Sequence, residues 1–193
     1  MRFDANYWES RWAKNQTGWD IGHVSTPIKE YIDQLEDKTI DILIPGCGQA
    51  WEGEYLHREE FPNVYLLDIA PTALKVFHER VPTFPVSNLL VDDFFKIEQT
   101  FDLIIEQTFF CALDPSFRME YIEKASKLLN PGGKLIGLLF ETDFGHDHPP
   151  FGGTQEDYLE LFSEHFEVQV MSSSNNSIEP RKGSELFIIL KKL

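Results

Sequence analysis

Short apolar runs alternate along the chain with longer stretches in which apolar residues recur every three or four positions. The apolar runs predict buried strands at 40–45, 64–67, 101–105 and 134–140, with a shorter strand inside 86–91. The periodic stretches predict helices at about 27–36, 50–60, 71–80, 115–129 and 155–164. Strands that alternate with helices in this way indicate an α/β fold with a doubly wound, mostly parallel sheet.

The C-terminal part of the chain follows a different pattern. Two apolar runs, 166–171 and 186–190, come after the last predicted helix with only a polar connection between them. Strands without an intervening helix pair as an antiparallel hairpin, so we expect one at an edge of the sheet. No linker or internal repeat interrupts residues 1–193, and this length suits a single domain.

A glycine turn follows the first predicted strand. Gly46-Cys47-Gly48 comes directly after Pro45, and Asp68 ends the second strand about twenty residues later. Glycine allows backbone conformations closed to other residues and lets a ligand approach the main chain. An acid at this spacing is typical of folds that bind ribose hydroxyls. We therefore expect an adenosine-containing cofactor at the carboxyl ends of these strands.

Trp51 stands where a dinucleotide fingerprint requires its third glycine. The pyrophosphate of NAD needs close backbone approach at that helix N-terminus. The sequence therefore disfavours an NAD-dependent oxidoreductase, while a cofactor without phosphates needs less room.

Polar and aromatic residues also follow the later strands. Asp92-Asp93-Phe94-Phe95 could border a purine, although a solvated acid pair beside core phenylalanines is the alternative. Gln107 follows the 101–105 strand, where it could meet the amino-acid end of a cofactor. Phe109 and Phe110 could wall an apolar acceptor site or could simply pack in the core.

The N-terminal segment, residues 1–36, is rich in tryptophan. Trp8 and Trp12 are four residues apart and share one helix face, and Trp19 follows them. They could pack on the core, or they could form an aromatic lid over a flat or cationic ligand, because tryptophan is the best cation–π partner. Residues 141–155 form a polar loop rich in glycine and proline, long enough to suggest a second functional lid.

Cysteine and histidine give little sign of catalysis or of metal binding. Cys47 has no evident activating base, so a small buried thiol is its expected role. His146 and His148 could form a metal pair, but no third and fourth ligands suggest themselves, so we expect no metal. Whether these histidines contribute to an acceptor site is left open.

Charge and composition argue against some classes of binding partner. The formal net charge of −15 should repel nucleic acid and anionic membranes. Residues 1–20 carry mixed charge without the apolar core of a secretory signal, and no apolar run approaches the length of a membrane span. We expect a cytoplasmic protein, monomeric, with a small-molecule substrate.

The chain contains the stretches YWESRW, TGWD, ILIPGCGQAWE, LLDIAPTAL, FDLIIEQTFFCAL, NPGGKLIGLLF and HPPFGGTQEDYLELF. These stretches resemble one family, the thiopurine S-methyltransferases among the S-adenosylmethionine-dependent methyltransferases. FDLIIEQTFFCAL is especially similar to the halide/thiol methyltransferase branch. The resemblance covers nearly the whole chain and implies a Rossmann-like methyltransferase fold with S-adenosyl-L-methionine as cofactor.

The resemblance also implies roles for individual residues. Cofactor contacts fall on Trp8, Trp12, Trp19, Gly46, Gly48, Asp68, Asp93, Phe94 and Gln107. Gln107 stands where the animal thiopurine enzymes have arginine and the plant halide/thiol enzymes often have tyrosine, which leaves the acceptor class open.

We expect methyl transfer by in-line displacement to a small soft nucleophile: a thiol, hydrosulfide, halide or thiopurine. Such a nucleophile arrives ionised, so no general base is required. The acceptor is expected between Phe109, Phe110 and the loop containing Pro149, Pro150 and Phe151. The alternatives are a non-catalytic nucleotide-binding module and the disfavoured NAD-dependent oxidoreductase.

Overall fold

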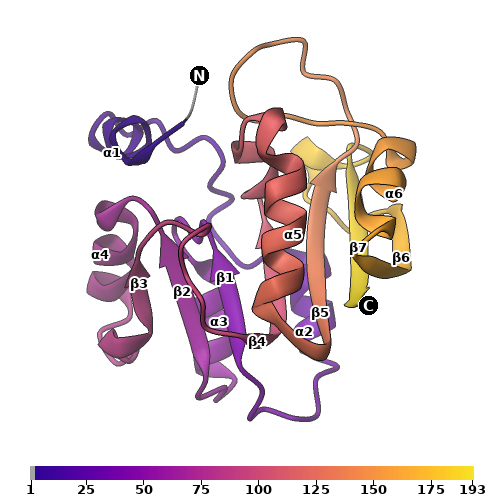
Figure 1. The fold of residues 1–193 in the computed structure, drawn as a ribbon. Helices are drawn as coiled ribbons and strands as arrows, with labels where there is room; N and C mark the ends of the chain where they lie inside the picture. The colour runs from indigo at the N-terminus through magenta and orange to yellow at the C-terminus, as the bar shows by residue number, and fades with distance from the viewer. Residues whose placement is uncertain (1–2) are drawn as a thin grey trace.

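A seven-stranded sheet lies at the centre of the structure, a computed structural model that describes residues 3–193 (Figure 1). The strand order is β3-β2-β1-β4-β5-β7-β6. Five strands are parallel: β1 (Ile42–Pro45), β2 (Val64–Asp68), β3 (Leu89–Val91), β4 (Phe101–Gln107) and β5 (Leu129–Phe140). β7 (Glu185–Lys192) pairs antiparallel with both β5 and β6 (Phe166–Ser173). The predicted α/β sheet with an antiparallel C-terminal edge is confirmed.

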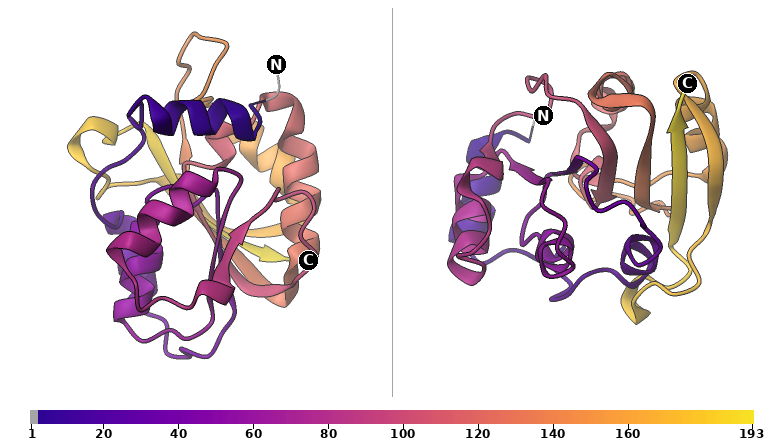
Figure 2. Two further views of the ribbon diagram at one scale, coloured as in Figure 1. Left: turned by 90° about the vertical axis from the view of Figure 1, so that its left-hand side faces the viewer. Right: turned by 90° about the horizontal axis from the view of Figure 1, so that it is seen from below.

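Helices cover both faces of the sheet (Figure 2). α2 (Thr26–Ile32), α3 (Trp51–Arg58) and α4 (Pro71–Arg80) pack on one face, and α5 (Arg118–Leu128) and α6 (Gln155–Ser163) pack on the other. Strand β1 shows why both faces need cover: Leu43 belongs to one hydrophobic cluster while Ile42 and Ile44 belong to the other.

The remaining elements lie at the ends of these layers. Helix α1 (Ala5–Ala13) crosses the end of the sheet rather than a face (Figure 1). Single-turn 3₁₀ helices occur at Val86–Asn88 (η1), Phe110–Ala112 (η2), Pro115–Phe117 (η3) and Glu179–Arg181 (η4). Within residues 3–193, no helix combines the length and the apolar character that crossing a bilayer requires.

Element boundaries follow the sequence closely at α4, where Pro71 begins the helix as expected. Other boundaries differ by a few residues, and for two of them the hydrogen bonds give the reason. Helix α2 ends at Ile32 instead of 36, because the next amides, of Gln34 and Leu35, bond carbonyls three residues back. Strand β4 runs two residues further than predicted, because Glu106 and Gln107 pair with β5.

Strand β5 begins before the segment 130–133, not after it as the predicted strand 134–140 would have it. Pairing with β4 jumps from Phe101 opposite Leu129 to Leu103 opposite Lys134. The residues between them therefore bulge out of the ladder. The glycine-rich sequence thus loops locally without ending the strand.

Candidate functional site

A cavity of about 600 Å³ opens at the carboxyl ends of the parallel strands, and its lining is mostly apolar. This volume is typical of small-molecule sites, and strand ends are where α/β sheets bind ligands. Eleven residues predicted for the cofactor or acceptor line it: Trp8, Trp12, Trp19, Gly46, Gly48, Asp68, Asp93, Phe94, Phe109, Pro149 and Pro150.

Asp68 joins the glycine turn to the start of α4. Its Oδ2 accepts a hydrogen bond from the Gly48 amide at 2.9 Å, and its Oδ1 accepts one from Ala70 at 2.8 Å. Burial raises the pKa of Asp68 to about 6, although the amide hydrogen bonds act in the opposite direction. The carboxylate is therefore held rigidly at the cavity wall, directly beside the turn.

The glycine turn is crowded by the protein's own aromatic rings. Gly46 has φ +56°, and a β-carbon there would lie 2.2 Å from the Phe109 ring. Gly48 has φ +53°, and a β-carbon there would lie 3.4 Å from Trp19 Nε1. Glycine is required here for left-handed backbone and for ring packing. The sequence predicted glycine here for the close approach of a ligand. The structure adds a second reason, the packing of Phe109 and Trp19 against the turn.

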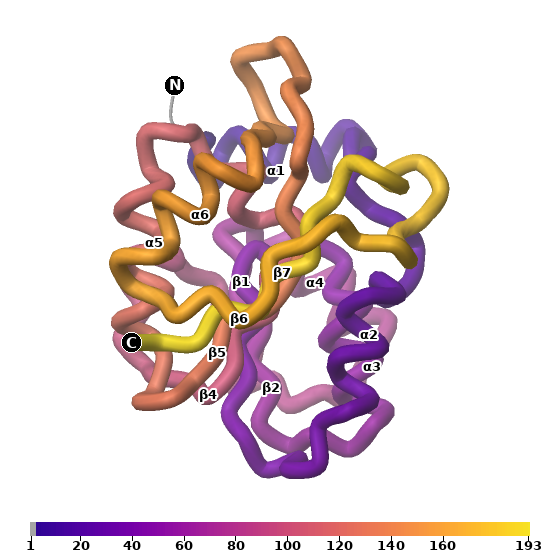
Figure 3. Tube along the Cα trace, turned by 90° about the vertical axis from the view of Figure 1, so that its right-hand side faces the viewer, coloured from indigo at the N-terminus to yellow at the C-terminus, as the bar shows by residue number. Residues whose placement is uncertain are grey.

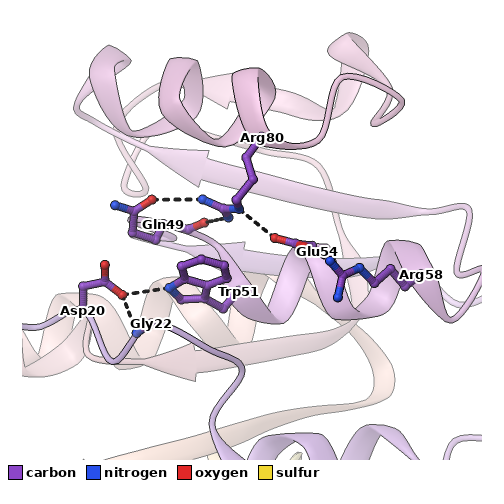
Figure 4. A network of polar contacts seen from close by, with 7 residues as sticks. All are labelled: Asp20, Gly22, Gln49, Trp51, Glu54, Arg58 and Arg80. Carbon is purple, nitrogen blue, oxygen red and sulfur yellow. Dashed lines mark hydrogen bonds and ion pairs between the residues drawn. The ribbon is translucent and has the colours of Figure 1, made fainter.

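A polar network fixes the back of this turn (Figure 4). Arg80 donates to Glu54 at 2.7 Å and to the side chain and carbonyl oxygens of Gln49. The same guanidinium lies 4.0 Å from the centre of the Trp51 ring, and Arg58 pairs with Glu54 from the following turn.

Trp51 connects this network to the N-terminal segment. Its Nε1 donates to Asp20 Oδ1 at 2.7 Å, and the same oxygen accepts the Gly22 amide at 2.8 Å (Figure 4). Trp51 does not line the large cavity. Trp51, which departs from the dinucleotide fingerprint, therefore anchors the N-terminal segment at Asp20.

Helix α1 is docked across the end of the sheet by Glu9. The Glu9 carboxylate accepts hydrogen bonds from the Thr72 amide at 2.8 Å and the Thr72 hydroxyl at 2.7 Å. The first turn of α4 has no capping side chain of its own, so Glu9 satisfies an amide that would lack a partner. The ring of Trp19 lies 5.5 Å from that of Trp8 and 6.2 Å from that of Trp12. The three tryptophans thus form one cluster over the cavity.

A second buried carboxylate supports the wall formed by Phe109. Glu106 accepts hydrogen bonds from the amides of Phe109 and Phe110, at 2.8 and 2.9 Å, and from the Tyr121 hydroxyl at 2.8 Å. Burial raises the pKa of Glu106 to about 7. The side chain is 1% exposed and lies outside the cavity lining, so it shapes the wall from beneath.

Two residues predicted for the acceptor site, Phe110 and Phe151, do not line the cavity. Phe110 is 1% exposed and packs against Tyr121 and Phe162, because η2 turns adjacent side chains to different sides. Phe151 also lies outside the lining. Its amide donates to the carbonyl of Cys111 at 2.7 Å, which anchors the loop.

Gln107 lies in a separate hollow of about 30 Å³ behind the glycine turn, together with Trp19, Gly46 and Gly48. Its Oε1 is buried and has no hydrogen-bond partner within residues 3–193. An unsatisfied buried acceptor is costly, so this atom is suited to a donor from a ligand. Its contact with a cofactor stays a prediction.

Two arginines missed by the sequence reading line the cavity. Arg181, from η4, donates to the Trp19 carbonyl at 2.7 Å across 162 sequence positions. No local pattern could reveal this contact. Arg11 stood inside the quoted YWESRW stretch, so its position beside Trp12 was an available signal.

The loop 141–154 projects beyond the other segments (Figure 3). His148 lines the cavity and His146 does not; their rings stack with centroids 4.0 Å apart. Among the described residues, no group of three or more His, Cys, Asp or Glu side chains is arranged to hold a metal ion. Burial raises the pKa of Cys47, so its thiol is not activated.

Sequence comparisons with known proteins match nearly the whole chain. A family model described as thiopurine S-methyltransferase matches residues 3–189. The chain is 32% identical to probable thiol methyltransferase 2 of Arabidopsis thaliana, over 92% of this chain and 81% of the relative. It is 29% identical to thiocyanate methyltransferase 1 of Brassica oleracea, over 96% and 84%.

A solved structure supports the fold independently. The 1,6-didemethyltoxoflavin-N1-methyltransferase of Burkholderia thailandensis, crystallised with its substrate and S-adenosylhomocysteine, superposes with a TM-score of 0.78. The match covers 97% of this chain and 86% of that one at 16% identity. At this identity the likeness concerns the fold alone.

Proposed function

Because the chain belongs to the thiopurine S-methyltransferase family, we propose that its cavity transfers a methyl group from S-adenosyl-L-methionine to a small soft nucleophile. The acceptor is a thiolate, hydrosulfide, halide or related anion, or a thiopurine. One observation carries the proposal: a single cavity contains both the Asp68–Gly48 pair and an apolar wall that includes Phe109 and Pro150.

The cavity has the groups that the cofactor requires. Asp68 keeps lone pairs free for ribose hydroxyls, since each of its oxygens accepts one amide in the structure. Phe94 offers an apolar ring and Asp93 a carboxylate at the end of β3 for the adenine. The tryptophan cluster suits a sulfonium, since a cation is attracted to the face of an indole ring.

Bound there, the cofactor supplies a methyl group that is already activated. The protein's own contribution is alignment and the exclusion of water, through the tryptophan cluster and Phe109. Arg181 lines the cavity beside the Phe140 ring, on the side where we place the acceptor; its charge is balanced by Glu185, and its remaining N–H groups can donate to an anionic acceptor. An ionised acceptor needs no proton transfer, which agrees with the high pKa values that burial gives Cys47 and Cys111.

Calorimetry and an acceptor screen test the proposal. We expect S-adenosylhomocysteine to bind and NAD not to bind. We expect release of S-adenosylhomocysteine with hydrosulfide, small thiols, iodide, thiocyanate or thiopurines. Asp68→Ala should weaken binding by about 1–3 kcal/mol. Activity confined to oxygen or nitrogen acceptors would contradict the acceptor class, and binding without turnover on any acceptor would indicate a non-catalytic module.

A further inference from the structure

The two arginines in the cavity differ in their partners. Arg181 pairs with Glu185, with Nη1 3.3 Å from the carboxylate, and both side chains are nearly buried. Arg11 has no ion pair among residues 3–193. Its Nη1 donates to the amide oxygen of Gln16 at 3.2 Å, and its guanidinium lies 5.6 Å from the centre of the Tyr7 ring. Its Nε is buried without a hydrogen-bond partner.

Among residues 3–193, the Arg11 guanidinium has no carboxylate partner; its recorded side-chain partners are Gln16 and the Tyr7 ring. Burying part of a charge without an opposite charge costs free energy, and so does an N–H without an acceptor. An anionic group on a ligand would satisfy both the charge and the orphaned donor.

Arg11 lines the same cavity as the glycine turn. It precedes Trp12, whose ring contacts Trp19, and Trp19 in turn lies against Gly48. A second orphaned polar atom is Oε1 of Gln107, in the small hollow. Trp19, Gly46 and Gly48 line both this hollow and the cavity that contains Arg11, so the unsatisfied acceptor and the unsatisfied donor lie in two spaces that share one wall. Together they are complementary to a zwitterion, which has one carboxylate and one ammonium group.

Resting on the proposed function, we propose that Arg11 binds the α-carboxylate of the amino-acid portion of the cofactor, with Gln107 Oε1 accepting a hydrogen bond from its ammonium group. The contact also links cofactor binding to the lid, because α1 carries Arg11 and is docked through Glu9. Arg181 then remains on the acceptor side, where its charge is already balanced by Glu185.

Two ligands separate this role from a structural one. S-adenosylhomocysteine contains the amino-acid portion, and 5′-methylthioadenosine is the same nucleoside thioether without it. We expect Arg11→Gln to weaken S-adenosylhomocysteine binding by 10-fold or more in calorimetry, while 5′-methylthioadenosine binding stays within 2-fold of wild type. Arg11→Lys should keep part of the affinity, since it keeps the charge but loses bidentate geometry. Lys14→Gln, an exposed basic residue at the end of the same helix, is the control and should change neither affinity.

Two results overturn the inference. Equal weakening of both ligands by Arg11→Gln would show that Arg11 only supports the lid. Unchanged S-adenosylhomocysteine affinity would place the carboxylate elsewhere. Failure of the wild-type protein to bind S-adenosylhomocysteine would be a different result, because it would reject the proposed function itself.

Discussion

On each of two sides of the cavity, a buried carboxylate accepts two backbone amides, but only one of the two carboxylates lines the cavity. On the glycine-turn side, Asp68 at the end of β2 accepts two backbone amides. On the opposite side, Glu106 near the end of β4 also accepts two. Asp68 lines the cavity, whereas Glu106 does not. A buried carboxylate that orders a turn can therefore be available to a ligand or can only support the cavity wall. Which of the two applies depends on whether the carboxylate reaches the cavity surface.

The largest expected loss of stability comes from a substitution at Gly46, where the two sides meet at the Phe109 ring. Gly46→Ala would force a side chain into left-handed backbone and into the Phe109 ring. We expect a loss of about 2–5 kcal/mol in the free energy of unfolding, measured by urea denaturation. Gly145→Ala is the matched control, since Gly145 has φ +66° but nothing lies within 4 Å of its β-carbon position. It should cost only about 1–2 kcal/mol; equal losses would mean that ring packing at Gly46 is unimportant.

The second prediction compares Asp68 with Glu106. Both should make the stability of the protein depend on pH in the same direction, but only Asp68 should affect ligand affinity. The pKa of Glu106 rises on folding from 4.5 to about 7, and that of Asp68 from 3.8 to about 6. The folded state therefore binds these protons more tightly than the unfolded state, and stability from this source is lost as pH rises through each window.

Replacing either carboxyl group with a side-chain amide, which does not titrate, removes this loss of stability at higher pH. We expect Glu106→Gln to gain stability relative to wild type by about 3 kcal/mol as pH rises from 4.5 to 7. Asp68→Asn should gain a similar amount between 3.8 and 6. Denaturation curves at several pH values measure both. Affinity for S-adenosylhomocysteine should fall for Asp68→Asn alone; a comparable fall for Glu106→Gln would erase the distinction between them.

A smaller effect is expected at helix α1, the proposed lid, whose Glu9 lies close enough to Asp68 to influence its pKa. Glu9→Ala removes two hydrogen bonds to Thr72, and α1 has no buried residue that would hold it otherwise. The helix should open locally without global unfolding. We expect about 1–2 kcal/mol weaker S-adenosylhomocysteine binding with little change in Tm. Tryptophan fluorescence reports the lid, and Glu36→Ala, at an exposed residue, serves as control. Unaltered fluorescence and affinity would show that other contacts dock α1.

The smallest effect is expected in the projecting loop, where neither carboxylate acts. His146 is exposed, stacks on His148 and does not line the cavity. His146→Ala should change the free energy of unfolding by less than about 0.5 kcal/mol. Acceptor KM values should stay near those of wild type. A loss of turnover would mean that the stacked pair acts as a unit at the acceptor.

Sequence predicted the parts of the site that depend on backbone conformation. Gly46, Gly48 and Asp68 are placed by the ends of strands, and strand ends can be read from apolar runs. Sequence could not distinguish Phe109 from Phe110, because the 3₁₀ turn between strand and helix decides which ring faces the cavity. It also could not find Arg181, whose position depends on the pairing of β7 with β5.

The insertion of β7 between β5 and β6 has a consequence for biosynthesis. β6 pairs with no other strand, and β5 has β7 as its neighbour on that side. While the nascent chain emerges from the ribosome, β6 has no partner and β5 keeps one open edge until residues 185–192 appear. Early folding can assemble the half that includes Asp68, but the half that includes Arg181 must wait for the last strand described here. A translating complex arrested before β7 should therefore expose an unpaired strand edge that chaperones would have to cover.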